Sequence, residues 1–577
     1  MKKSNKIVAF ILAVSMVISV FTVPVFANED VDGKPLQVVY TVLDKVVNGL
    51  VGGIAAMIKT PKWTKEADYK TSPAFIKGTV KADGTSDFTN KVKDGQKWSL
   101  GYSTASILTG NEVGETCDGD YYVGGSLSVT KKLATAQWDD QVVRTIAISD
   151  GRYLHIFAVL DAYGMANTDV LAIREKFLEG YKGRMPIGSI NISALHQHSC
   201  VDTFGMNGDI VSALFTSSFK TTFGIELPSG QNKKFMENLY NVTIKSMNDA
   251  ISNMTEGTLK FGTVNVEEFI REKRDPIAFD PNINCFRFIP GNGSRETWIC
   301  NAGIHCVGNG AAGTELTGDY PLYMQRYIDK NYNANFFYIL GAELAISQTD
   351  HTETETEPGI VKKYISANEA EWAKEATYNS NTNDMRAMGE IMAQKLYGIS
   401  EWQTVAPILN TCYKEAKIKI DNNILILAAK GGLLVNNVVK SGLGKFKIVT
   451  EVGYAEFGNN IAVAIIPGEL EACIAFGINE NPKYYKDLTN GCQVPGALCW
   501  NGEKWENETF KNAVGNKKLV VFGLTNDQVG YLLMNNEWHS IFTENEEVVS
   551  AGKMAADTVA KTFLGIVKEY KTEMMPG

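Results

Sequence analysis

The sequence predicts an α/β fold with mixed sheet layers and βαβ units. Two alternations of strand and helix indicate this architecture. In the first, an apolar run of strand length at 153–160 is followed by apolar residues at helical spacing over 169–178, and a second strand-like run follows at 187–195. This order of elements is typical of a pair of parallel strands joined by a crossover helix.

The second alternation lies about 140 residues further along the chain. It has strand-like runs at 297–304 and 336–340 on either side of a helical pattern at 321–328, whose first turn contains a proline. Apolar runs at 461–466 and 519–524 add further strands, each followed by a polar or glycine-containing turn.

The composition is that of a globular protein with a large core. The chain has 577 residues, 44% of them hydrophobic and 21% charged. This length excludes a small disulfide scaffold and fits two to four domains or one elaborated domain. The net charge of −9 argues against nucleic acid as a partner, because binding to a phosphate backbone depends on basic patches.

Residues 1–27 have the features of a secretory signal peptide. Lys2, Lys3 and Lys6 precede an apolar stretch over 7–21, and Ala27 is a small residue suited to signal peptidase. The stretch is short for a bilayer span, so we expect cleavage after Ala27 and a secreted or cell-envelope protein.

Residues 28–74 form an expected N-terminal helical extension. Its apolar segment at 46–58 contains three glycines and is too short to cross a bilayer, so a surface helix is predicted and no transmembrane segment is expected in the mature chain. The chain has nine cysteines, an odd number, and only Cys492 and Cys499 suggest a short disulfide loop. The segment 350–358 alternates Thr and Glu and is expected to be an exposed loop.

Four residues with metal-binding or catalytic side chains follow predicted strands. His196, His305, Glu469 and Tyr531 each lie at or just beyond an apparent strand end. Because ligands of open α/β sheets collect at the carboxyl ends of strands, these four side chains are expected to converge.

His196 and His198 form an HxH pair, which would lie on one face if the strand continued through it. Neutral imidazole is the commonest zinc ligand, but a pair alone is equally compatible with a structural role. The residues that follow differ from the metallo-β-lactamase motif, and an amidohydrolase barrel would carry the pair near its start. His155 lies inside an apolar run and is expected in the core, whereas His351 and His539 are expected in surface loops.

From roughly Phe75 to its end, the chain resembles the neutral/alkaline non-lysosomal ceramidases, in which a strand ends in H-T-H-S-G-P where this sequence has H-Q-H-S-C-V from His196. Further short motifs of that family follow in the same order. They are Arg-x-Pro (Arg274, Asp275, Pro276), a strand ending in His305, D-Y-P (Asp319, Tyr320, Pro321), P-G-E (Pro467, Gly468, Glu469), and G-L-x-N with a following tyrosine (Gly523, Leu524, Asn526, Tyr531).

The resemblance implies a catalytic region over 75–577, without the C-terminal immunoglobulin-like domain of the family. It further implies that His196, His305, Glu469 and Tyr531 hold one Zn²⁺ ion. Two neutral imidazoles and one carboxylate leave a zinc ion with net positive charge, which acidifies a bound water and polarises a carbonyl group.

The resemblance also assigns three catalytic or substrate-binding residues. His198 corresponds to a histidine that hydrogen-bonds the substrate or its oxyanion, and Arg274 to an arginine of the substrate pocket, although arginines in charged runs usually lie on a solvated surface. Ser347 falls where the family has its active-site serine, but the flanking Gly-Asp and Pro are replaced by Leu344, Ala345 and Gln348. Cys200 and Val201 replace a Gly-Pro at the site entrance, and these larger side chains are expected to narrow it.

The expected function is therefore that of a secreted zinc-dependent amidohydrolase. Its expected substrate is ceramide or a related N-acyl lipid, presented at a membrane surface and cleaved to fatty acid and amine. Two alternatives remain open at this point: a zinc hydrolase of another amide or ester, and a catalytically degenerate homologue that binds a lipid or envelope component. The sequence does not indicate an oligomeric state.

Overall fold

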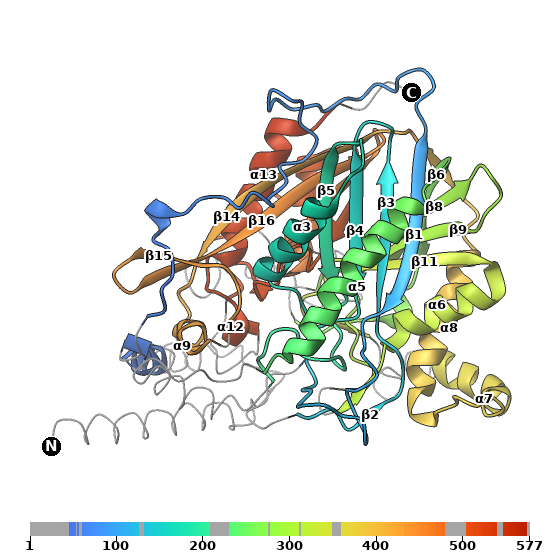
Figure 1. Ribbon diagram of the computed structural model, residues 1–577, viewed down its shortest axis with the longest axis horizontal. Helices are drawn as coiled ribbons and strands as arrows, with labels where there is room; N and C mark the ends of the chain where they lie inside the picture. Colours follow the sequence, from blue (N-terminus) through green and yellow to red (C-terminus); the bar gives the residue numbers. More distant parts are fainter. Residues whose placement is uncertain are drawn as a thin grey trace.

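The computed structural model of the chain describes residues 45–53, 55–56, 60–125, 132–207, 230–274, 277–310, 313–348, 359–432, 434–478, 504–538 and 546–573. Several expectations lie outside these ranges: the signal peptide, the exposed loop at 350–358, the Cys492–Cys499 pair, and His351 and His539. Within them the fold is mixed α/β, as predicted, with one sheet of nine strands and one of five (Figure 1).

Both predicted βαβ units belong to the nine-stranded sheet. Strands β4 and β5 are parallel and are joined through helix α3, and β9 and β11 are parallel and are joined through α6. The strand order is β11-β9-β8-β6-β1-β3-β4-β5, with β13 paired to β6. The bounds are β1 Trp98–Ser106, β3 Val142–Ser149, β4 Leu154–Leu160, β5 Ile187–Ala194, β6 Thr255–Asn265, β8 Asn282–Pro290, β9 Glu296–Ala302, β11 Ala334–Leu340, β13 Gln403–Val405, α3 Asn167–Gly180 and α6 Asp319–Tyr332.

The five-stranded sheet has the order β14-β16-β17-β19, with β15 paired to β16. Strands β17 and β19 are the apolar runs predicted at 461–466 and 519–524, and they pair in parallel. The bounds are β14 Leu409–Lys419, β15 Val438–Gly442, β16 Lys445–Phe457, β17 Ile461–Ile465 and β19 Lys518–Phe522.

The remaining elements are helices on the outer faces and short strands in the connections. The helices are α5 Lys233–Ser252, α7 Ile360–Trp372, α8 Asn383–Tyr397, α9 Asn423–Gly431, α10 Ala472–Phe476, α11 Phe510–Val514, α12 Glu546–Val549 and α13 Ala555–Tyr570. The short strands are β2 Ala136–Gln137, β7 Ile270–Glu272, β10 Glu315–Leu316, β12 Ile346–Gln348, β18 Glu469–Leu470 and β20 Tyr531–Leu532. The 3-10 helices are η1 Glu66–Asp68, η2 Glu267–Phe269 and η3 Ser380–Thr382.

The two sheets pack face to face between outer helices, in four layers (Figure 1). Side chains of β4 point alternately to the two faces of the sheet, and both faces are apolar. Phe157 and Val159 enter the core between the sheets, whereas Ile156 and Ala158 face α3 and α5. On the far side of the second sheet, Phe563 of α13 packs against that sheet's outer face. Each fully buried side chain of this size contributes about 1.5–3 kcal/mol, so the alternation fixes which face of each strand points inward.

The nine-stranded sheet curls so that its two edges approach each other. Strand β11 lies at the opposite edge from β5 in the pairing order, yet it contacts β3, β4 and β5. The Tyr102 hydroxyl of β1 donates a hydrogen bond to the Phe336 carbonyl of β11, with an O···O distance of 3.1 Å. This curvature brings the carboxyl ends of β5 and β9 together, which strand order alone would not do.

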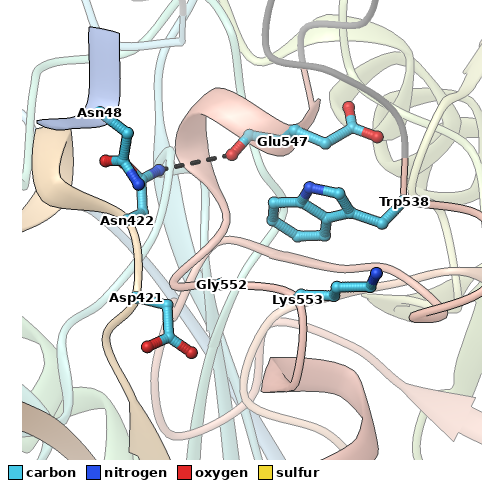
Figure 2. Close-up of a pocket in the computed structure, with 7 residues that line it drawn as sticks. All are labelled: Asn48, Asp421, Asn422, Trp538, Glu547, Gly552 and Lys553. Carbon is cyan, nitrogen blue, oxygen red and sulfur yellow. Dashed lines mark hydrogen bonds between the residues drawn. The ribbon is translucent and has the colours of Figure 1, made fainter. Parts of the chain in front are cut away.

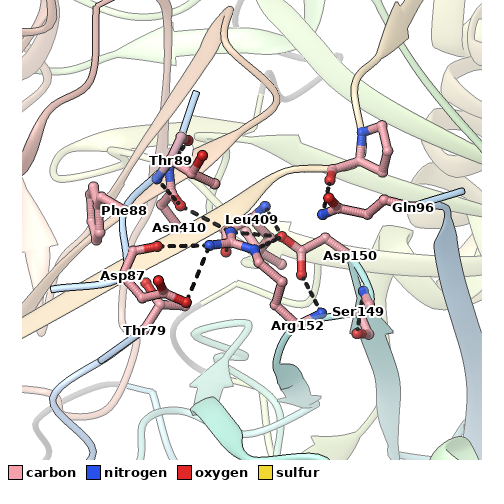
Figure 3. A network of polar contacts seen from close by, with 12 residues as sticks. Thr79, Asp87, Phe88, Thr89, Gln96, Ser149, Asp150, Arg152, Leu409 and Asn410 are labelled. Atoms are coloured by element: carbon pink, nitrogen blue, oxygen red, sulfur yellow. Dashed lines mark hydrogen bonds and ion pairs between the residues drawn. The ribbon is translucent and has the colours of Figure 1, made fainter. Parts of the chain in front are cut away.

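A polar network ties the two sheets at the end away from the strand carboxyl termini of β4 and β5 (Figure 3). Arg152, in the turn between β3 and β4, donates to the Leu409 carbonyl at 3.1 Å and to the Asn410 side chain at 3.0 Å, both at the start of β14. Its partner Asp150 accepts from the Leu409 backbone N–H at 2.9 Å. The network fixes the first residues of β14 next to the β3–β4 turn.

A short helix near the N-terminus packs against α9. Residues 45–53 are helical, Val51 and Ala55 are buried, and the Asn48 side chain accepts from the Asn423 backbone N–H at 3.0 Å. No helix within the described ranges is both long and apolar enough to span a bilayer. The seven cysteines in the same ranges are free thiols, six of them buried.

Candidate metal centre

His196 lies two residues beyond β5, and its ring is held from two sides. Its Nδ1 is 2.9 Å from the Tyr163 carbonyl oxygen, and the Tyr163 ring stacks on it with centroids 4.5 Å apart. The backbone at His196 has a φ of 50°, which turns the chain sharply. The condition under which His196 and His198 would share one strand face is therefore not met: β5 ends at Ala194, and a turn presents the two histidines.

His305 lies three residues beyond β9 and is fixed by β12. Its backbone N–H and its Nδ1 both donate to the Ile346 carbonyl, at 3.1 and 2.8 Å. The D-Y-P motif supports the same loop. The Tyr320 hydroxyl donates to the Ile304 carbonyl at 2.7 Å, and the Asp319 carboxylate accepts from the Gly308 N–H at 2.7 Å.

Glu469 opens β18, four residues beyond β17, and its carboxylate faces both histidines. Oε1 accepts from the Gln528 side chain at 2.8 Å, which directs Oε2 toward the imidazoles. Oε2 lies 3.3 Å from Nε2 of His196 and 3.4 Å from Nε2 of His305. All three residues are buried, with at most 6% of any of them exposed.

The G-L-x-N motif holds β5 against the loop after β19. The Asn526 side chain accepts from the Ile192 N–H at 2.9 Å, and the hydroxyls of Ser193 and Thr525 are 2.8 Å apart. Leu524 and Asn526 both have positive φ, so the loop follows a path that few residues adopt. Its contacts place the strand that delivers His196 beside the segment that carries Gln528.

The three side chains present lone pairs to one another. A carbonyl oxygen only accepts, so Nδ1 of His196 and of His305 must carry the hydrogen, which leaves Nε2 of a neutral ring as an acceptor. Burial lowers the pKa of His305, so this imidazole is neutral at pH 7. Burial alone would raise the pKa of Glu469, but the positive charge and the hydrogen bonds that the two facing histidines supply when protonated lower it, so the carboxylate is charged.

These donor atoms fit a zinc ion. Glu469 Oε2 faces the two Nε2 atoms at 3.3 and 3.4 Å, and acceptors at these distances repel unless a cation lies between them. A tetrahedral ion with bonds of about 2.0–2.1 Å separates its ligands by about 3.3 Å. The chemistry of the donors, two imidazole nitrogens and a carboxylate oxygen, is that of zinc sites as well.

Comparison with known proteins shows which fold carries this arrangement. No family model matches the sequence, and no curated protein matches it significantly. Among solved structures, the neutral ceramidase of Pseudomonas aeruginosa matches with a TM-score of 0.57 and 14% identity, over 84% of this chain and 76% of that one. A ceramidase complexed with C2 matches with a TM-score of 0.56 and 15% identity, over 84% of this chain and 77% of that one. The chain has the neutral ceramidase fold.

Within this neutral ceramidase fold, His198 joins the same cluster. Its ring centroid is 4.7 Å from that of His196 and 5.6 Å from that of His305, and its backbone N–H donates to the Cys306 carbonyl at 3.1 Å. Burial, and then the two neighbouring histidines, lower the pKa of His198 well below its usual value. Its Nε2 is buried and has no hydrogen-bond partner among the described residues.

Tyr531 lies beside Glu469. The two residues are opposite each other in the parallel pairing of β18 with β20. Burial, and then the negative charge of Glu469, raise the pKa of Tyr531 well above its usual value. Its assignment as a zinc ligand remains a prediction from the family resemblance.

Ser347 lies in β12, and Arg274 lies two residues beyond β7, the strand that pairs with β12. Ser347 follows Ile346, the residue that holds His305, and its hydroxyl donates to the Gln348 carbonyl at 3.0 Å. Arg274 is buried, so the alternative of a solvated surface arginine is wrong. Its guanidinium donates to the Glu547 carboxylate of α12 at 2.8 Å.

A cavity of about 190 Å³ lies beside α12 (Figure 2). Glu547 and Trp538 line it, together with Asn422 at the start of α9, whose side chain donates to the Glu547 carbonyl at 3.4 Å. Trp538 also packs against the cluster of Leu344, Ala345 and Leu533, as Tyr531 does. A continuous row of side chains thus connects this cavity to Tyr531 and Glu469.

Two residues near the metal cluster were not predicted from the sequence. Tyr163 follows β4 and stacks on His196. Glu343 lies three residues beyond β11 and is fully buried. One of its carboxyl oxygens, one ring nitrogen of His305 and one carboxyl oxygen of Glu469 all lie within 4.8 Å of one another. Burial, and then the charge of Glu469, raise the pKa of Glu343 well above its usual value. Both follow strand ends, so the rule that selected His196 and His305 could have found them.

Proposed function

We propose that this chain is an exported, zinc-dependent amidohydrolase that cleaves ceramide or a related N-acyl lipid to a fatty acid and an amine. The observation that carries the proposal is the buried Glu469 carboxylate that faces the Nε2 atoms of both His196 and His305, in a chain with the neutral ceramidase fold. The order of the short sequence motifs along the chain also supports it.

The proposed zinc ligands are His196, His305, Glu469 and Tyr531. A zinc ion held there would polarise the amide carbonyl and lower the pKa of a water molecule. The surrounding chain fixes the ligands: the carbonyls of Tyr163 and Ile346 set the imidazole tautomers, and Gln528 orients Glu469. Such outer partners keep ligand atoms aimed at one point and make the ligands more basic.

His198 is the proposed partner of the substrate carbonyl oxygen. Its depressed pKa keeps the ring neutral at pH 7, and its Nε2 has no hydrogen-bond partner in the described part of the chain. A neutral imidazole that carries its hydrogen on Nε2 donates one hydrogen bond to the oxygen on which charge develops. Removal of one such donor typically costs about 10²- to 10³-fold in rate.

Ser347 and Arg274 are proposed to act on the substrate side of the centre. Ser347 adjoins the residue that holds His305, so its hydroxyl lies on the strand that borders the site. Arg274 binds Glu547 of α12, which lines the cavity of Figure 2. The lipid substrate is expected to reach this side from a membrane surface.

The test is hydrolysis by the purified protein of a panel of N-acyl lipids and matched esters. We expect release of fatty acid from ceramide or another N-acyl lipid, loss of activity with a chelator, and recovery with zinc. If the protein hydrolyses only esters, or only amides that are not lipids, the proposed substrate class is wrong, but the proposal of a zinc-dependent hydrolase stands. Binding of the lipids without turnover, with zinc bound, would support a degenerate homologue instead.

A further inference from the structure

We infer that Glu343 is a second carboxylate of the metal centre and binds the same cation as His305 and Glu469. The inference deepens the proposed function and rests on it, because it presupposes that a divalent cation occupies this cluster. None of the short family motifs in the sequence includes Glu343, so its role follows from its surroundings alone.

Glu343 is a buried carboxyl group without a partner. It is 0% exposed, and neither of its carboxyl oxygens has a hydrogen-bond partner among the described residues. Burial of a polar group without a partner is costly, and burial of a charge is far more so. A side chain that stays in such a position in a folded protein is expected to have a ligand there.

The position of Glu343 places it at the proposed zinc site. It follows β11, and a donor oxygen of its carboxyl group is grouped with those of His305 and Glu469, all within 4.8 Å of one another. The β11–β12 turn that carries Glu343 also carries Ile346, whose carbonyl holds the His305 ring. One segment therefore fixes the imidazole and supplies the carboxylate.

The charge of the cluster also calls for a cation. Among the described residues, neither Glu343 nor Glu469 forms an ion pair with a lysine or arginine, and Glu469 faces two imidazoles and Gln528. Two carboxylates buried side by side repel each other, and neutral imidazoles supply no compensating charge. A divalent cation bound between them makes the centre neutral and removes both costs.

The experiment compares Glu343→Gln with a matched control, Glu471→Gln. Glu471 is also a buried glutamate with one unpaired oxygen, and it lies two residues beyond Glu469, but its other oxygen accepts from the Met534 N–H at 2.6 Å. The measurement is the zinc dissociation constant of each full-length protein, by competition with a chromogenic chelator. We expect a loss of zinc affinity of about tenfold or more for Glu343→Gln and less than about threefold for Glu471→Gln.

Thermal unfolding of the metal-free proteins separates a binding defect from a folding defect. Because glutamine keeps the shape of the buried carboxyl group and carries no charge, the metal-free Tm of Glu343→Gln should equal or exceed that of the wild type, while the rise in Tm on adding zinc should shrink. Equal zinc affinity in Glu343→Gln and wild type would overturn the inference and leave the proposed function intact. Equal losses in both variants would also overturn it. Absence of zinc binding by the wild type would overturn the proposed function itself.

Discussion

Two backbone carbonyls determine which ring nitrogen of His196 and of His305 can bind a cation. The Tyr163 carbonyl binds Nδ1 of His196, and the Ile346 carbonyl binds Nδ1 of His305. Because each carbonyl accepts a hydrogen, each ring is left with a bare Nε2, and both Nε2 atoms point at Glu469. The affinity of the site for a cation thus depends on loop backbone as much as on the ligands themselves.

Ser347 gives a prediction at the residue scale. If a water molecule is the nucleophile, Ser347→Ala should lower turnover of the N-acyl lipid by about 10²- to 10³-fold and leave the zinc content unchanged, because it removes one positioned hydroxyl. Steady-state kinetics at matched zinc content measures this. Complete loss of turnover would indicate a covalent serine nucleophile, and unchanged turnover would exclude Ser347 from the reaction.

The sequence predicts individual ligands where a strong apolar run precedes a metal-binding side chain. His196, His305 and Glu469 satisfy this condition, and the structure brings them together. Glu343 also follows a strand and stands among apolar residues, but a glutamate in a turn is usually solvated, so its sequence position alone does not distinguish it from a surface residue. Its burial depends on Glu469 and His305, which are distant in sequence.

At the scale of elements, the turn with the two histidines is held by its neighbours. Gln197 forms an isolated parallel bridge with Cys306, which joins this turn to the turn that carries His305. Gly125 packs directly against the backbone of His198 in this turn. Its φ is +113°, and a Cβ there would lie 2.2 Å from the Cα of His198. Only glycine fits this contact.

Gly125→Ala should therefore displace the turn with the two histidines. We expect turnover to fall by about 10²-fold, because a shift of about 1 Å at a site costs that much, with weaker zinc binding as well. Gly110→Ala is the control, since Gly110 also has positive φ (+82°) but a Cβ added there would have no atom within 4 Å. Equal effects of the two substitutions on turnover and zinc affinity would show that backbone strain alone is responsible.

The strands and helices near the site were predictable because each is a long periodic segment. The turns that carry the site were not, because φ at His196, Leu524 and Asn526 is positive without a glycine to signal it. Tertiary contacts such as the hydrogen bond from the Ile192 N–H to Asn526 impose these conformations.

At the scale of the whole molecule, the curvature of the nine-stranded sheet creates the site. Strands β5 and β11 lie at opposite ends of the pairing order, and only their approach across the curled sheet lets His196 meet His305. Sequence periodicity gives the strands and their faces but contains no information on how far the twist accumulates over nine strands.

Asp527 links several parts of the molecule and gives a prediction on stability. Its Oδ1 accepts from the Asn167 N–H at 2.9 Å and from Asn436 at 2.7 Å, and burial raises its pKa to about 7. Between about pH 4 and pH 7 the unfolded chain therefore loses this proton while the folded chain keeps it, so the free energy of unfolding falls as the pH rises. The loss from this group is at most about 4 kcal/mol.

Asp527→Asn should remove this pH dependence, because the amide oxygen can accept the same hydrogen bonds and carries no charge. The difference in free energy of unfolding, variant minus wild type, should become more positive from pH 4 to pH 7 and level off above it. Denaturant unfolding at a series of pH values measures the difference. A difference that stays constant with pH would show that Asp527 has an ordinary pKa in the folded protein.

The zinc content of the purified protein tests the central claim most directly. Elemental analysis of the wild type is expected to give about one zinc per chain, and His196→Ala and Glu469→Ala should each retain almost none, because each loses one of the three facing donor atoms. His198→Ala should still contain about one zinc, since its proposed role is hydrogen bonding. A wild type without zinc, or full zinc content in both His196→Ala and Glu469→Ala, would contradict the account.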